Sequence, residues 1–232
     1  MSEDTIVKYL KSISNDEVAK VTKSFFKTNK GQYSHGDIFL GIKVPDIRKA
    51  IKKFPTASLI KIEMLLSSKY HEVRHFALLY MVGSFSKAVQ KEKDNIYNIY
   101  LKNTKHINNW DLVDCSAHHI VGSYLEDKDK ETLYKLALSN SLWERRIAIV
   151  STFYFIKQNS FDHTLKIAEM LLNDQEDLIH KAVGWMLREV GKKDEALEKT
   201  FLDKHAKKMP RVMLRYAVER FAKEDRKFYL NL

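Results

Sequence analysis

The sequence predicts an all-α protein built from stacked helix pairs, and three observations support this fold class. The 232 residues include only 7 Gly and 3 Pro, so few residues interrupt helices. The segments between turn signals run for about ten to seventeen residues, which is typical of helices rather than strands. Sustained alternation of apolar and polar residues, the mark of a half-buried strand, is missing from the sequence.

Two segments show the three-and-four spacing of apolar residues that defines one face of a helix. In "SSKYHEVRHFALLYMVGSF" that face consists of Val73, Phe76, Ala77 and Tyr80. In "SLWERRIAIVSTFYFIKQ" it consists of Trp143, Ile147, Val150 and Tyr154. We therefore expect one helix in each segment.

Short stretches built around a small residue recur along the chain. Their alanines, separated by 40, 31, 34 and 35 residues, are Ala77, Ala117, Ala148, Ala182 and Ala217. Small residues let helices approach closely, and this period is typical of HEAT-like solenoids, whose concave face is an extended binding surface. We expect one domain over residues 1–232, with about six antiparallel helix pairs and a concave basic groove. An ordinary helical bundle is the alternative.

The segment "KGQYSHGDIFLGIKVPDIRKAIKKF" departs from the helical pattern. It contains Gly31, Gly36 and Gly41, and then "VPD", which predicts a new helix that opens at Pro45. Arg48 would then lie near a helix N-terminus, a place suited to a phosphate group. The alternative is a capped loop between two helices.

Charge and composition narrow the class of partner. Lys and Arg number 40 against 30 Asp and Glu, a net charge of +10, which favours nucleic acid first and an acidic membrane surface second. The alternative is a basic protein that is merely soluble. A single cysteine excludes an intramolecular disulfide, and we find neither a secretory signal nor an apolar run near twenty residues. We expect a cytoplasmic protein.

The stretch "NNWDLVDCSAHHIVG" carries the residues that most suggest chemistry. Trp110, Asp114 and His118 are spaced i, i+4 and i+8, so they would share one stripe of one helix. A surface carboxylate and a core tryptophan are the structural alternatives. Cys115 with His118 and His119 suggests a nucleophile and base, but a buried inert thiol is commoner. Asp114, His118 and His119 match no recognised zinc spacing.

Four motifs resemble the AlkD-type DNA alkylation repair glycosylases. They are "FLGIKVPDIRK" at 39–49, "WDLVD" at 110–114, "ERRIAI" at 144–149 and "HKAVGWMLRE" at 180–189. The resemblance runs from about residue 30 to 225. It implies HEAT-like repeats around a basic groove, and excision of cationic N3- and N7-alkylated purines from double-stranded DNA. We expect a monomer, because a groove that accepts duplex DNA needs to stay open. No cofactor or metal is implied.

The resemblance also implies roles for individual residues. It makes Asp114 the catalytic acid, with Trp110 and Trp185 clasping the sugar–phosphate of the lesion and Arg146 contacting phosphate and sugar. It assigns further DNA contacts to Lys43, Arg48, Arg188 and Tyr33. Arg145, the neighbour of Arg146, is the alternative for the arginine contact to DNA. It also implies that the lesion stays stacked in the duplex rather than being flipped into a pocket.

The chemistry of such a reaction would explain why the acid Asp114 lies one helical turn from the indole of Trp110. Alkylation makes the purine a cationic leaving group, so positive charge develops on the sugar as the bond to the base breaks. An ionised Asp114 would stabilise that charge and orient the attacking water, as glycosidase carboxylates do. The indole faces would add about 0.5–2 kcal/mol each through cation–π attraction.

Two other functions fit the sequence. A non-catalytic DNA-binding paralogue would keep the solenoid and bind damaged or structured DNA without turnover. A scaffold for a protein partner would have an apolar or mixed concave face and weak DNA affinity. Turnover of methylated DNA separates the glycosylase from both alternatives.

Overall fold

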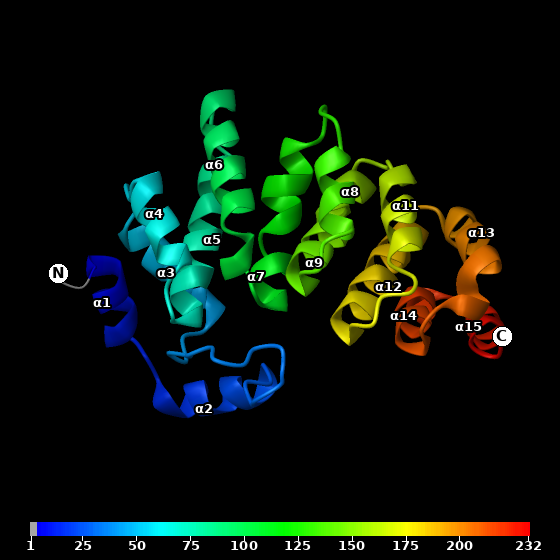
Figure 1. Ribbon diagram of the computed structural model, residues 1–232, viewed down its shortest axis with the longest axis horizontal. Helices are drawn as coiled ribbons and strands as arrows, with labels where there is room; N and C mark the ends of the chain where they lie inside the picture. Colours follow the sequence, from blue (N-terminus) through cyan, green and yellow to red (C-terminus); the bar gives the residue numbers. More distant parts are fainter. Residues whose placement is uncertain (1–3) are drawn as a thin grey trace. The chain divides into compact units, whose positions relative to one another are not determined.

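The computed structural model describes residues 4–232, and this part of the chain is helical (Figure 1). Within these residues no β-strand is found, and Ile38 and Tyr70 form an isolated bridge. The predicted all-α class is therefore confirmed. No helix among the described residues has both the length and the apolar character needed to cross a membrane.

Contacts within the chain group the helices into two compact units that divide between Ser116 and Ala117. The α-helices of the first unit are α1 (Thr5–Ser12), α2 (Asp16–Phe25), α3 (Val44–Lys53), α4 (Leu59–Leu66), α5 (His71–Phe85), α6 (Gln90–Lys102) and α7 (Trp110–Asp114), with a 3-10 turn at Thr104–His106. Those of the second unit are α8 (Glu131–Ala137), α9 (Leu142–Ser151), α10 (Phe153–Lys157), α11 (Asp162–Met170), α12 (Asp177–Gly191), α13 (Glu195–His205), α14 (Arg211–Ala217) and α15 (Lys223–Leu230). The second unit also has a π-helical turn at His118–Gly122 and 3-10 turns at Ala206–Lys208 and Val218–Arg220.

The first predicted helix is α5, and it forms the core of the first unit. Residues on every side of its N-terminal turns are buried, including the predicted apolar face. It packs against α3 and α4, and it ends at Phe85. A helix buried all round is expected at the centre of a helical protein.

The second predicted helix is divided in the structure. α9 ends at Ser151 and α10 begins at Phe153, with Thr152 between them. The hydroxyl of Ser151 donates to the carbonyl of Ile147 at 2.6 Å, and that of Thr152 donates to the carbonyl of Ile149 at 2.6 Å. Hydroxyls that bond back to carbonyls of the preceding turn often bend helices. The apolar periodicity alone gave no sign of this break.

The glycine-containing segment is a loop, as expected. Gly31, Gly36 and Gly41 have φ values of 80°, 90° and 74°, in the left-handed region that favours glycine. Pro45 is the second residue of α3 rather than its first, because the helix begins at Val44.

A buried carboxylate holds the end of this loop. The backbone N–H of Leu40 donates to Glu72 Oε2 at 2.8 Å, and those of Gly41 and Ile42 donate to Glu72 Oε1 at 2.7 and 3.2 Å. Glu72 is 3% exposed and is the second residue of α5. The loop is therefore fixed to the central helix of the first unit.

The predicted recurrence of small residues is borne out by burial. All five recurring alanines have no exposed surface. Two glycines in the second unit make equivalent contacts: a Cβ on Gly122 would lie 2.2 Å from the carbonyl oxygen of Ser151, and one on Gly184 would lie 2.4 Å from that of Met213. In both cases the partner follows 29 residues after the glycine. The backbone at a glycine thus lies close to the backbone of a later helix at two places in the second unit.

Substituting alanine at Gly184 is expected to lower the free energy of unfolding by about 2–3 kcal/mol, because the new methyl group meets the backbone of α14. Urea denaturation measures this loss. Gly83→Ala is the matched control, because Gly83 lies within α5 and a Cβ there meets nothing within 4 Å. That variant should gain about 0.5–1 kcal/mol from helix propensity. Equal effects at the two positions would contradict the close approach at Gly184.

Candidate functional site

The motif "WDLVD" forms α7, a helix of only five residues. Asn109 precedes it with no exposed surface; its Oδ1 accepts from the N–H of Trp110 at 2.8 Å, and its Nδ2 donates to Ser34 Oγ at 2.6 Å. Trp110 and Asp114 are the first and last residues of the helix, and both are partly exposed.

His118 does not continue this helix, so the predicted stripe of three residues on one helix is wrong. α7 ends at Asp114, and His118 opens a π-helical turn. Ser116 lies at the interruption, where its hydroxyl donates to the carbonyl of Leu112 at 2.6 Å and lies 3.0 Å from Tyr100 Oη. This side-chain bonding gives the backbone an alternative to a regular helix.

Trp110 is fixed by aromatic neighbours. Its ring stacks on Phe26 with centroids 5.2 Å apart and meets Phe25 edge-on at 5.8 Å. Its Nε1 donates to Tyr33 Oη at 3.2 Å. Tyr33, a predicted DNA contact, is thus brought beside the predicted lesion-clasping tryptophan.

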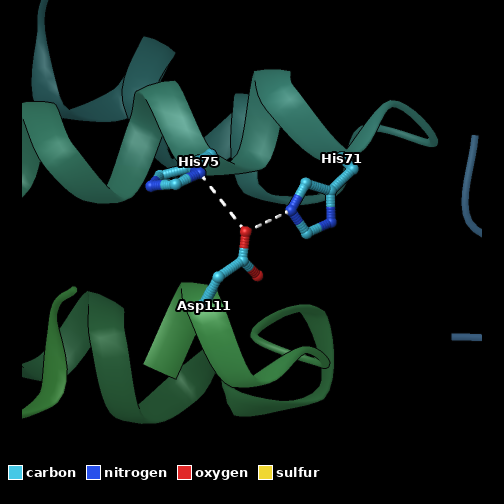
Figure 2. Close-up of side chains that lie close together, drawn as sticks. All are labelled: His71, His75 and Asp111. Atoms are coloured by element: carbon cyan, nitrogen blue, oxygen red, sulfur yellow. Dashed lines mark hydrogen bonds and ion pairs between the residues drawn. The ribbon is translucent and has the colours of Figure 1, made fainter. Parts of the chain in front are cut away.

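Asp111, the other acid of α7, has a different environment from Asp114. His71 and His75 project from α5 toward it, and one oxygen faces both imidazoles (Figure 2). His71 Nε2 lies 2.8 Å from Asp111 Oδ2, and His75 Nδ1 lies 3.6 Å from the same oxygen. The side chain of Asp111 is 15% exposed. Asp111 therefore makes its contacts in the interior of the first unit.

The two histidines differ in charge. Burial by itself would lower the pKa of His71, but the charge of Asp111, the hydrogen bond to Asp111 and the nearby carboxylate of Asp37 raise that pKa to about 9. Burial lowers the pKa of His75 to about 4, and the charge of Asp111 offsets this only in part. At pH 7 His71 is therefore a buried cation, whereas His75 is neutral.

A second carboxylate completes the network around His71. Asp37 Oδ1 accepts from Arg74 at 2.7 Å, and Asp37 Oδ2 lies 3.6 Å from His71 Nδ1. Burial alone would raise the pKa of Asp37, but the nearby His71 ring and the charge of Arg74 keep it below its ordinary value. Two carboxylates and two cations thus balance one another inside the first unit.

Three of these residues have side chains that could bind a metal ion. His71, His75 and Asp111 place one possible ligand atom each within 4.8 Å of the others. The ion pair between His71 and Asp111 accounts for this approach, and Arg74 adds a further positive charge beside the group. We assign no metal to it.

Cys115 is suited to packing rather than nucleophilic attack. Burial raises the pKa of its thiol well above the ordinary value, and the charges of Asp111 and Asp114 raise it further. The Sγ donates to the carbonyl of Leu112 at 3.4 Å. The thiol is therefore protonated at neutral pH and a poor nucleophile.

The second unit holds the two adjacent arginines on α9. Arg146 is 5% exposed and donates to the carbonyl of Leu178, on α12, at 2.5 Å. Arg145 donates from Nε to Asp174 Oδ2 at 2.6 Å and from a terminal nitrogen to the carbonyl of Ser139 at 2.9 Å. Both guanidinium groups are oriented by contacts within this unit.

Trp185 lies on α12 and is partly exposed. Its ring packs against Phe153 with centroids 5.7 Å apart, and its Nε1 donates to Glu189 Oε1 at 3.2 Å. Arg188, on the same helix, forms ion pairs with Glu219 and, at 3.8 Å, with Glu189. The indole is thus held by a ring contact with Phe153 and by its N–H bond to Glu189.

The structure brings some of the predicted residues together within each unit. In the first, Tyr33 touches Trp110, and Asp114 lies on the same short helix. Lys43 and Arg48 are exposed at the start of α3. In the second, Arg146 contacts the helix that carries Trp185 and Arg188.

Sequence reasoning missed the charged network of His71, Asp111, Asp37 and Arg74. A signal was present, since His71 and His75 are four residues apart in "HEVRH" and share a helix face. Their partner Asp111 is 40 residues beyond His71, which no local pattern reveals.

Glu198, on α13, should make the free energy of unfolding depend on pH. Burial raises its pKa from 4.5 to about 8, with the charge of Glu195 adding to the effect and that of Arg188 opposing it. Between these values the folded state binds a proton that the unfolded state has lost. Stability from this group is therefore complete below pH 4.5 and is lost as pH rises through about 8.

Glu198→Gln should remove this loss because glutamine stays neutral. At pH 8.5 we expect the variant to exceed wild type by about 2–4 kcal/mol in free energy of unfolding, and at pH 4.5 to match it within about 1 kcal/mol. Urea denaturation at both pH values measures the difference. Glu131→Gln, at a side chain that is 69% exposed, is the control. The same pH profile in wild type and Glu198→Gln would contradict the assignment.

Two solved structures share the fold of this chain. The fold matches that of a predicted DNA alkylation repair enzyme from Enterococcus faecalis, with a TM-score of 0.71 and 19% identity over 90% of this chain and 97% of that one. It also matches smu.31 from Streptococcus mutans UA159, with a TM-score of 0.53 and 19% identity over 94% and 98% of the two chains.

A family model described as DNA alkylation repair enzyme matches residues 6–221. The chain belongs to this family, and the resemblance found in the sequence is confirmed. The comparison with curated proteins gives no match.

Proposed function

We propose that the protein is a DNA glycosylase that releases positively charged N3- and N7-alkylated purines from duplex DNA in base excision repair. The proposal rests on the arrangement of side chains on α7, in a chain that belongs to a DNA alkylation repair family. This helix places a partly exposed carboxylate, Asp114, one turn after a partly exposed indole, Trp110. The other acid of this helix, Asp111, pairs with His71 inside the first unit.

The carboxylate suits the charge that the reaction creates. The bond from the base to C1′ breaks with its electron pair leaving on the cationic purine, which becomes neutral, while the sugar becomes oxocarbenium-like. Asp114 stabilises that positive charge and orients the water that attacks C1′. Because the alkylated purine is already a good leaving group, the residues need not protonate it.

DNA binding is assigned to basic and aromatic residues in both units. The net charge of +10 favours phosphate contacts. Lys43 and Arg48 contact the DNA backbone, Arg146 contacts phosphate and sugar, and Trp110 and Trp185 clasp the sugar–phosphate of the lesion. In this proposal the helices form a HEAT-like solenoid of about six antiparallel pairs, and its concave basic groove receives the duplex. The lesion stays stacked, which departs from the base flipping usual among glycosylases.

The test is release of 7-methylguanine from a methylated duplex in excess enzyme, followed by chromatography and mass spectrometry. We expect time-dependent release of the free base and an abasic site in the same strand, with nothing released from the unmethylated duplex. Tight binding without release would contradict the glycosylase and favour the non-catalytic DNA-binding paralogue. Neither binding nor release would favour a scaffold for a protein partner.

A further inference from the structure

α7 is too short to be a stable helix by itself. Isolated helices shorter than about 12–15 residues are marginal in water, and α7 has five residues and stops at an interrupted turn. The positions of Trp110 and Asp114, at its two ends, therefore depend on what surrounds it. Three polar contacts on the N-terminal side of α7 supply this support.

Two of these contacts join α7 and the residue before it to the loop between Gly31 and Gly41, and the third joins α7 to His71 of α5. Tyr33 accepts from the indole of Trp110 at 3.2 Å, and Ser34 accepts from Asn109 at 2.6 Å. The third contact passes through His71, which lies between Asp37 of the loop and Asp111 of the helix.

The loop itself is anchored to α5. Arg74 pairs with Asp37 at 2.7 Å and donates to the carbonyl of Ser68 at 2.9 Å. Glu72 accepts the backbone N–H groups at the end of the loop. His71 is 2% exposed and pairs with Asp111, so this ion pair ties the short helix to α5, the central helix of the first unit.

We propose that His71 and Asp111 are positioning residues, whose ion pair holds α7 so that Asp114 and Trp110 keep their working geometry. This inference rests on the proposed function. His75 lines the other side of the same Asp111 oxygen at 3.6 Å and limits its movement. Positioning of this kind matters because a displacement of about 1 Å can cost 100-fold in rate.

The test compares Asp111→Ala and Asp111→Asn with wild type under single-turnover conditions, at a temperature where each is folded by circular dichroism. For Asp111→Ala we expect a 10- to 100-fold lower rate constant of 7-methylguanine release, with DNA affinity changed by less than about threefold. Asp111→Asn, which keeps the shape and a hydrogen bond to His71, should recover part of the rate.

Hydrogen exchange supplies a readout that does not need activity. Peptides covering residues 107–117 should exchange faster in Asp111→Ala than in wild type, because α7 loses its tie. Tyr134→Phe is the control: it removes the contact between Tyr134 Oη and His163 Nδ1, 2.6 Å apart in the second unit. That variant should change neither the rate constant nor exchange in these peptides.

The outcomes separate this inference from the proposed function. A wild type that releases no methylated base overturns the proposed function. An active wild type whose rate constant and α7 exchange are both unchanged in Asp111→Ala overturns the positioning role. Equal losses of rate in Asp111→Ala and Tyr134→Phe also overturn it, because they would reflect general destabilisation.

Discussion

Asp114→Asn is expected to lower the single-turnover rate constant of 7-methylguanine release by about 100- to 1,000-fold. Asparagine keeps the size of the side chain and its hydrogen-bonding oxygen but removes the negative charge that faces the developing sugar cation. Losses of this size follow when one group that stabilises transition-state charge is removed from an active site. Binding of undamaged duplex should not weaken, because the variant carries one negative charge fewer next to the phosphates.

The matched control for this variant is Asp127→Asn. Asp127 lies in the second unit, and its side chain is 83% exposed. The same change in net charge at this position should leave the rate constant within about twofold of wild type. Equal release by wild type and Asp114→Asn would remove the proposed mechanism, and an equal loss in both variants would assign the effect to net charge alone.

Glu72→Ala is expected to lower the free energy of unfolding by about 3–5 kcal/mol. The substitution leaves the buried N–H groups of Leu40, Gly41 and Ile42 without their acceptor. An unsatisfied buried polar group costs about 1–3 kcal/mol, and hydrogen bonds to a charged group are the stronger kind. The loop that seats α7 should loosen at the same time.

Urea denaturation measures this effect, and two variants bracket it. Glu72→Gln keeps one acceptor oxygen but turns an amide NH₂ toward the donors, so we expect an intermediate loss. Glu17→Ala removes a side chain that is 83% exposed and paired with Lys20, and should cost less than about 1 kcal/mol. A loss below about 1 kcal/mol for Glu72→Ala would mean that the three N–H groups find other acceptors.

Much of the fold could be predicted because helices are local structures. The spacing of Val73, Phe76 and Tyr80 predicted α5, since residues three and four apart share a helix face. The three glycines marked the loop before α3 because their left-handed backbone is costly for other residues. Recurrent alanines marked the positions where helices pack closely, and all five are buried.

The candidate site was only partly predictable. The pairing of Trp110 with Asp114 one turn apart was visible in the sequence, and α7 preserves it. The end of that helix at Asp114 was not, because a continuous apolar pattern carries no sign of the bonds that Ser116 makes to Leu112 and Tyr100.

By itself, then, the sequence determined the helical class, the family and the short motif that bears the acid, since each depends on neighbouring residues or on a pattern along the chain. Only the tertiary structure decided which acid of α7 forms an ion pair in the interior of the first unit. Asp111 pairs with His71, 40 residues earlier, and His71 also faces Asp37. Ion pairs between distant residues depend on how helices pack in space, because charge interactions act through distance and burial rather than through order along the chain.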